Sequence, residues 1–222
     1  MIGQAGSVVA ARDEFAALLP VSVRVRGRKH PETITIRVSL ARWTGEAGEE
    51  AKARDQAAAL VPVAERALGP EHPVTLDARV NLARWTGEAG EAAKARDQAA
   101  ALVPVAERAL GPEHPVTLDA RANLAFFIGQ AGDAAAARDQ YAALVPVCVR
   151  ALGPEHPETL TTRSNVAHWT GEAGDAAAAR DQYAALLPVY VRVLGPEHPE
   201  TLKVRSNIAH WTTKADKRRR LW

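Results

Sequence analysis

Histidines at a fixed spacing are the first residues in this sequence whose chemistry could matter. Each stands in a Gly-x-x-His-Pro segment, and the five are His30, His72, His114, His156 and His198. Zinc requires its ligands about 2 Å from one point, whereas equivalent positions in stacked helices lie roughly 10 Å apart. We therefore predict that each imidazole bonds to the backbone of its own turn, and that the chain holds no metal and needs no cofactor.

The single cysteine offers little chemistry either. At the position of Cys148 the other repeats have Ser22, Ala64, Ala106 and Tyr190. This variation indicates a position that tolerates substitution rather than a nucleophile. The recurring Gly-Glu-Ala-Gly segments lack the lysine and the preceding strand of a phosphate-binding loop. No pair of residues stands out as acid, base or nucleophile, so we predict no catalytic residues and a protein that is not an enzyme.

The histidine segments mark a repeat of 42 residues that covers most of the chain. A fixed period of this length is typical of stacked supersecondary units, each too small to bury its apolar face alone. Two units are nearly copies, because residues 41–79 aligned on 83–121 differ only at Glu50 and Ala92. The recurrence of a residue therefore reflects duplication as well as functional requirement. The positions that vary between repeats say more about function.

The composition restricts which binding partners and which cellular compartment are expected. The chain has 222 residues, and its 28 Lys and Arg against 26 Asp and Glu leave no general basic field of the kind that holds nucleic acid. The exception is a basic tail over residues 214–222. No apolar run approaches the roughly 18 residues of a membrane span, and the start lacks the features of a signal peptide. We expect a cytoplasmic protein without nucleic-acid or membrane partners.

Each repeat reads as two helices. From Thr75, apolar residues at helical spacing predict a first helix (helix A) of about 12 residues, with Thr75 as its cap. Gly87 and Gly90 end it, and Glu91 opens an alanine-rich second helix (helix B) of about 20 residues, a composition that disfavours a β-propeller. A proline recurs two-thirds along helix B, where we expect a bend or a break. These prolines are Pro20, Pro62, Pro104, Pro146 and Pro188.

The residue pattern resembles the tetratricopeptide repeat. Its order and spacing match in Asn81-Leu82-Ala83, then Gly90, Ala95 and Leu102, with an aromatic at Tyr141 and Tyr183, and this disfavours HEAT or armadillo repeats of similar period. The 42-residue length and the Leu-Gly-x-x-His-Pro-x-Thr link are similar to the extended variant in kinesin light chains and in many bacterial proteins. The resemblance implies an all-α fold, an α-solenoid of stacked antiparallel helix hairpins with a right-handed superhelix.

Two rows of residues depart from that family. Arginines stand where a large aromatic is often found early in helix A, and an aromatic follows later. We predict that the tryptophans fill the groove between helices A and B, and that the arginines bridge to carboxylates such as Asp55 and Asp97; a solvated row of arginines is the alternative. The two rows are Arg37, Arg79, Arg121, Arg163 and Arg205, and Trp43, Trp85, Phe127, Trp169 and Trp211.

The resemblance also implies a binding face, since helix A lines the concave surface in tetratricopeptide stacks. An asparagine row is then expected to face a bound peptide backbone, with residues of changing charge beside it. The expected peptide-binding residues are Asn81, Asn123, Asn165, Asn207, Arg42, Arg84, His168, His210, Asp77 and Asp119. The alternative is a solvated helix face that drifted after duplication.

The phase of the repeat organises the domain. We predict one solenoid over residues 1–213, with an orphan helix B at 7–26, four full repeats at 32–194, an orphan helix A at 200–212, and a basic tail at 214–222 that caps the last helix or stays disordered. The predicted function is a scaffold that binds an extended peptide or protein segment. The alternatives are head-to-tail self-association through the complementary half-repeats, or a sensor fragment of a larger signalling protein.

Overall fold

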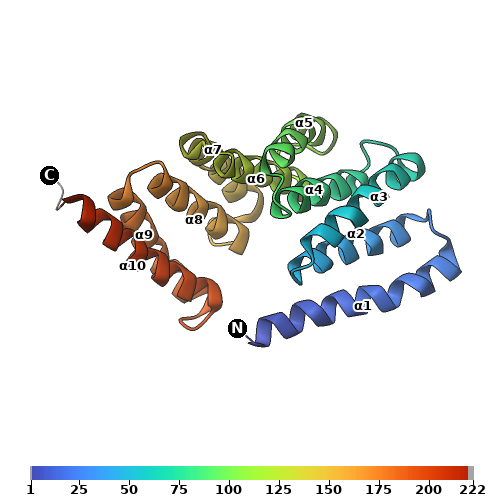
Figure 1. Cartoon of the computed structure of the whole chain (residues 1–222), viewed down its shortest axis with the longest axis horizontal. Coiled ribbons are helices and arrows are strands. Elements are labelled where there is room, and N and C mark those ends of the chain that lie inside the picture. Colours follow the sequence, from blue (N-terminus) through green and yellow to red (C-terminus); the bar gives the residue numbers. More distant parts are fainter. Residues whose placement is uncertain (1, 220–222) are drawn as a thin grey trace. The chain divides into compact units, whose positions relative to one another are not determined.

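The computed structural model describes the backbone of residues 2–219 and the side chains of residues 7–217. Within that range the chain is all helical and contains no strand (Figure 1). The helices are α1 (Ile2–Arg26), α2 (Pro31–Glu46), α3 (Glu50–Leu68), α4 (Pro73–Glu88), α5 (Ala92–Leu110), α6 (Pro115–Gln130), α7 (Ala134–Leu152), α8 (Pro157–Glu172), α9 (Ala176–Leu194) and α10 (Pro199–Arg219). The even-numbered helices are the predicted helices A, and the odd-numbered ones are helices B.

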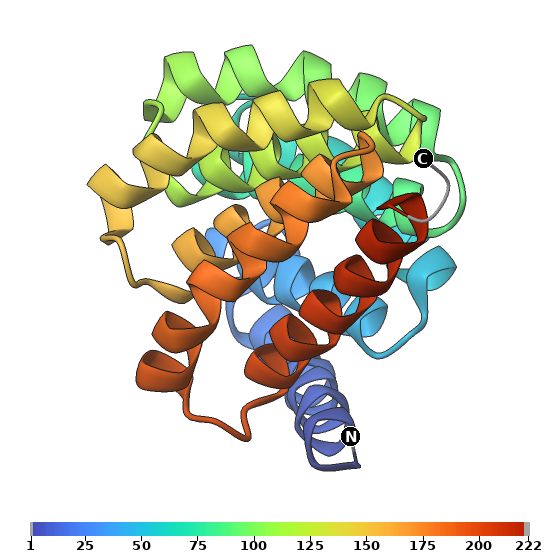
Figure 2. The ribbon, with the colours of Figure 1, turned by 90° about the vertical axis from the view of Figure 1, so that its left-hand side faces the viewer.

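The chain divides into two compact units with a boundary inside α6, one from Met1 to Leu124 and one from Ala125 to Trp222. In the first unit α1, α2, α3, α4 and α5 pack in chain order, and α4 also contacts α2. In the second unit α7, α8, α9 and α10 pack in the same way, as the orange and red helices of Figure 2 show. Within each unit these helices thus pack against their neighbours in sequence, which confirms the predicted all-α fold of stacked hairpins.

The recurring histidines cap the helices A. His72 Nδ1 accepts a hydrogen bond from the backbone N–H of Val74 at 3.2 Å, and Pro73 occupies the first helical position, where its missing N–H leaves no bond unmade. All five histidines make this bond. The predicted backbone role of the histidines is confirmed, whereas Thr75 as a cap is wrong, because His72 is the cap and Thr75 lies buried in the first turn of α4.

The helix ends also differ from prediction. Each helix B runs through its proline without a break and ends at a glycine such as Gly69, whose φ of 97° is a conformation that glycine adopts easily. Helix α1 begins at Ile2 rather than at residue 7. Helix α10 continues to Arg219, so residues 214–219 of the expected tail are helical, and the remainder lies outside the described residues.

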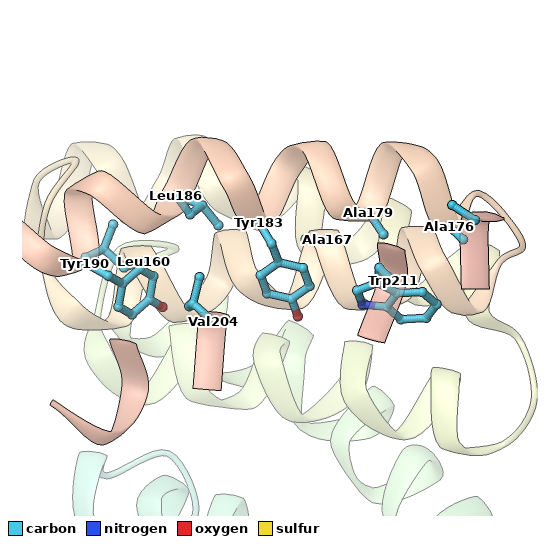
Figure 3. Packing of buried hydrophobic residues seen from close by; sticks show 10 residues of the cluster. Leu160, Ala167, Ala176, Ala179, Tyr183, Leu186, Tyr190, Val204 and Trp211 are labelled. Atoms are coloured by element: carbon cyan, nitrogen blue, oxygen red, sulfur yellow. The ribbon is translucent and has the colours of Figure 1, made fainter. Parts of the chain in front are cut away.

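Tryptophan on glycine is the contact that joins successive helices A. The indole of Trp85 in α4 lies against Gly45 of α2, so close that a Cβ at Gly45 would stand 2.5 Å from the ring. The same contact recurs between Trp169 and Gly129, and between Trp211 and Gly171. In the second unit Trp211 also belongs to the apolar cluster of α8 and α9 (Figure 3). The aromatics therefore fill the groove of the preceding hairpin.

The arginine row finds carboxylates, but not the predicted ones. Arg79 pairs with Glu65 at 2.8 Å, and Arg121 lies 3.8 Å from Glu107. Asp55 instead contacts the adjacent Arg54, and Asp97 the adjacent Arg96. The predicted partners Asp55 and Asp97 are wrong because an aspartate that follows an arginine directly is held by that neighbour.

The fit of tryptophan on glycine yields a test. Gly45→Ala should lower the free energy of unfolding by about 1–3 kcal/mol, because the new methyl group overlaps the ring of Trp85. Chemical unfolding followed by circular dichroism measures this.

Trp85→Leu supplies the control. Without the indole, the same Gly45→Ala change should be neutral or stabilising, since alanine is favoured over glycine inside a helix by about 1 kcal/mol. An equal loss in both backgrounds would contradict the contact.

Candidate functional site

One face of every helix A carries side chains that vary between repeats. In α4 these are Asp77, Asn81 and Arg84, which stand four and then three residues apart and therefore share one side of the helix. We call this side, together with the equivalent positions of the other helices A, the helix-A face. All ten residues predicted to bind a peptide belong to it.

In the first unit the structure brings six of the ten predicted residues to one depression. It lies across α2, α4 and α6, and Val80 completes its wall. The six are Arg42, Asp77, Asn81, Arg84, Asp119 and Asn123. Two carboxylates, two guanidinium groups and two amides thus line a shared polar surface.

The two asparagines of this unit are already bonded within the chain. Asn81 is buried, and its Nδ2 donates to the backbone oxygen of Asp77 at 2.9 Å and to the Asp77 carboxylate at 3.0 Å. Asn123 Nδ2 donates to the backbone oxygen of Val80 at 3.3 Å. Asn81 therefore holds Asp77 in place, and Asn123 ties α6 to α4.

Asp77 is the most perturbed acid of this surface. Burial, and then repulsion from Asp119, raise the pKa of Asp77 from 3.8 to about 6, while Arg42 and the hydrogen bond from Asn81 oppose the rise. A carboxylate in this state gains from an incoming cation, because a positive group would relieve both the desolvation and the repulsion.

Arg84 is held from two sides. Its guanidinium pairs with Glu46 of α2 at 2.8 Å, and its central carbon lies 4.6 Å from the ring centroid of Trp85. The planar guanidinium suits both contacts. Arg84 is therefore a fixed positive edge of the depression, whereas Arg42 is exposed.

In the second unit the helix-A face is aromatic and cationic. The rings of His168 and His210 lie edge-on to the tryptophans that follow them in sequence, with centroids 4.9 Å and 4.8 Å apart. Lys214 Nζ lies 4.5 Å from the centroid of Trp211 and 3.5 Å from Glu172. Burial lowers the pKa of His168, and the positive charges of Lys214, His210 and Lys203 lower it further against the pull of Glu172.

The asparagines of the second unit differ from those of the first. Asn165 and Asn207 are half-buried, and neither amide hydrogen-bonds to another group among the described residues. Their donors and acceptors stay available, which an extended backbone can use.

Sequence reasoning missed three charged residues of this face. Glu46 and Glu172 come four residues after Arg42 and His168, and this spacing alone would have placed them on the same side of the helix. Lys214 was assigned to the tail, because α10 was expected to end at residue 212.

Two further observations concern metal binding and membrane spans among the described residues. No three histidine, cysteine, aspartate or glutamate side chains among them gather in a way that would hold a metal ion. None of the helices in the described range has both the length and the apolar character to cross a membrane.

Comparison with known protein families identifies the family of the chain. One sequence model of the tetratricopeptide repeat matches residues 33–74 and 75–116, and a second matches residues 119–190. These matches cover more than half of the chain. The protein is an all-helical repeat protein, and it belongs to the tetratricopeptide repeat family. Such repeats form protein–protein interaction scaffolds, and the chain is a scaffold of this class. A search of curated proteins found no match.

Two solved structures illustrate the similarity. The nearly identical TPR-like repeats named for a kinesin light chain of Podosopora anserina match with 23% identity and a TM-score of 0.70, over 86% of this chain and 90% of that one. BtubC (BKLC) from P. vanneervenii matches with 16% identity and a TM-score of 0.71, over 96% of this chain and 83% of that one. At these identities the likeness shows a shared fold, of the kinesin-light-chain-like kind.

The raised pKa of Asp77 predicts a pH dependence. Between pH 3.8 and about 6 the folded chain keeps a proton on Asp77 that the unfolded chain has released, so stability falls as pH rises through this range. The effect of this one group reaches at most about 3 kcal/mol. Asp77→Asn should remove that fall, so the variant gains stability over the wild type as pH rises from 4 to 7.

Chemical unfolding at a series of pH values checks this as a difference between variant and wild type, which cancels other titrating groups. Asp97→Asn is the matched control, because the Asp97 side chain is 69% exposed. A difference between Asp77→Asn and wild type that does not change with pH would refute the assignment.

Proposed function

We propose that the helix-A face binds an extended segment of a partner protein. The observation that carries this proposal is the convergence of six predicted residues on one polar depression in the first unit. A peptide backbone offers alternating donors and acceptors, and its side chains offer charges for Asp77 and Arg84 to select.

The charge of the helix-A face differs between the two units. In the first unit the raised pKa of Asp77, next to Asp119, favours a basic side chain of the partner. In the second unit His168, His210 and Lys214 favour an acidic or aromatic one. Each unit therefore selects a segment of its own chemistry, because a segment with the opposite charge would place like charges together.

The asparagines of the second unit supply the test. Peptides are first selected from a random phage-displayed library on the full chain, and their affinities are then measured by calorimetry. Asn165→Ala combined with Asn207→Ala should weaken a selected peptide about tenfold, because two hydrogen bonds worth about 0.5–1.5 kcal/mol each are lost.

Lys94→Ala is the control, since Lys94 is exposed at the start of α5, a helix B. An unchanged affinity in the double asparagine variant, or an equal loss in Lys94→Ala, would remove the asparagines from the site.

A specific observation favours a second candidate function, self-association. The side chain of Leu18 in α1 is 51% exposed, whereas the leucines at the same position of the other helices B are 1–8% exposed. Leu202 of α10 is 43% exposed, whereas its equivalents are 0–4% exposed. Within a repeat these two positions pack on each other, as Leu160 and Leu186 do in Figure 3. A second copy could therefore bring Leu202 onto Leu18.

Sedimentation equilibrium over a wide concentration range tests self-association. The wild type should gain mass with concentration, and Leu18→Glu or Leu202→Glu alone should prevent this, because a buried unpaired carboxylate is costly. Ala100→Glu, on an exposed part of α5, should have no effect. A wild type that stays monomeric at every concentration excludes this function.

A further inference from the structure

A second groove lies between two helices B of the first unit, with α2 at its floor. It encloses about 610 Å³, and its apolar walls come from Leu19, Pro20 and Val23 of α1 and from Val63 of α3. Three cations complete it: Arg28 and Lys29 from the turn after α1, and Arg37 from α2. We call it the α1/α3 groove.

The α1/α3 groove is separate from the helix-A face. Arg37 and Arg42 stand five residues apart on α2, which places them about 140° apart around the helix axis. Arg42 lines the polar depression across α2, α4 and α6, and Arg37 lines the groove between α1 and α3. A partner in one site leaves the other accessible.

The repeats provide an internal comparison for Arg37. In the next two repeats the equivalent arginines are neutralised, Arg79 by Glu65 and Arg121 by Glu107. The residue that corresponds to these glutamates in α1 is Val23. Among the described residues Arg37 has no carboxylate partner, and burial together with the nearby charge of Arg28 lowers its pKa.

A second neutralising carboxylate is also missing. Glu71 pairs with Arg108, and Glu155 pairs with Arg192, in two of the other repeats. The residue in place of these glutamates before α2 is Lys29, and the arginine in the place of Arg108 is Arg66 of α3. Because lysine stands here in place of glutamate, Arg66 lacks the carboxylate that pairs with Arg108 and Arg192, and the segment carries an additional positive charge.

The cations around this groove therefore outnumber the acids. Of the nearby carboxylates, Glu32 pairs with Arg26 at 2.6 Å, and Glu65 is held by Arg79. Arg28, Lys29, Arg37 and Arg66 have no ion pair among the described residues. By contrast, Arg79 and Arg121, which are equivalent to Arg37, and Arg108, which is equivalent to Arg66, each pair with a glutamate. Like charges held together without counter-charges favour an anionic partner.

We propose that the α1/α3 groove binds an acidic protein segment that carries apolar side chains beside its carboxylates. Arg37 at the floor and Lys29 at the rim pair with the carboxylates, and guanidinium groups suit them geometrically. The apolar side chains pack on Leu19, Val23 and Val63. A nucleic acid fits less well, because its phosphates lie on a polar backbone that gains little from an apolar wall.

The test uses a fluorescein-labelled twelve-residue peptide built from repeated Leu-Glu-Asp, titrated with the full chain and followed by fluorescence anisotropy. Val23→Glu gives Arg37 the carboxylate that Arg79 and Arg121 have, in a substitution that the fold already accepts at Glu65 and Glu107. Lys29→Glu restores the residue of the other repeats. Each change should weaken the peptide about tenfold.

Lys52→Gln is the charge-matched control. Lys52 is exposed and pairs with Glu49 at the start of α3, so its loss also lowers the net charge by one, as Val23→Glu does, but outside the groove. Its effect should stay below about twofold. Thermal unfolding by circular dichroism confirms that each variant folds.

The outcomes separate cleanly. No binding to the wild type, or an equal loss in all three variants, overturns the proposal, since the second result would show only general charge attraction. A peptide with serine in place of leucine that binds as well as the original also overturns it, because the apolar walls would then be unused. A labelled single-stranded RNA that binds more tightly than the peptide, and is lost in Val23→Glu, would replace the protein segment with a nucleic acid. Binding at the helix-A face is unaffected by any of these results.

Discussion

The packing of tryptophan on glycine is the contact on which the rest of the structure depends. An indole of one helix A lies where a side chain of the preceding helix A would be, and only glycine leaves that space. The contact fixes how closely successive helices A approach within each unit. That approach decides which polar residues meet on the helix-A face, such as Arg84 of α4 and Glu46 of α2. The tryptophan–glycine contact therefore sets the spacing of the charged residues on the helix-A face, although those residues are not part of the contact.

Constant packing allows the polar residues to change. The buried threonines, the capping histidines and the tryptophans recur from repeat to repeat, and they keep the backbone the same. The half-buried positions of the helix-A face carry less of this constraint, so Arg84 in one repeat is His168 in another. The proposed binding functions depend on residues that differ between repeats. The two surfaces argued above, the helix-A face and the α1/α3 groove, are both defined by such differences.

The sequence predicted the helices, their order and the backbone role of the histidines, because these follow from local spacing and turn chemistry. It failed where the partner of a side chain comes from another repeat. The arginine row is expected to reach carboxylates such as Asp97, yet the neighbouring Arg96 holds that aspartate and Glu65 pairs with Arg79. The asparagine row is expected to face a bound peptide, but Asn81 is bonded to Asp77, whereas Asn165 makes no hydrogen bond among the described residues. Such pairing depends on which acid lies next to which base across a helix contact, and a period alone does not specify this.

The near-identity of two repeats has a consequence for how the chain finds its register. A hairpin shifted by one whole repeat would meet almost the same apolar surface, so burial alone discriminates poorly between the correct alignment and the shifted one. The charged positions that differ between repeats break this degeneracy. Glu65 is matched by Arg79, whereas a shift of one repeat would bring Val23 to that arginine and leave it without its acid. The charged positions on which the proposed selectivity depends thus also distinguish one repeat from another while the chain folds.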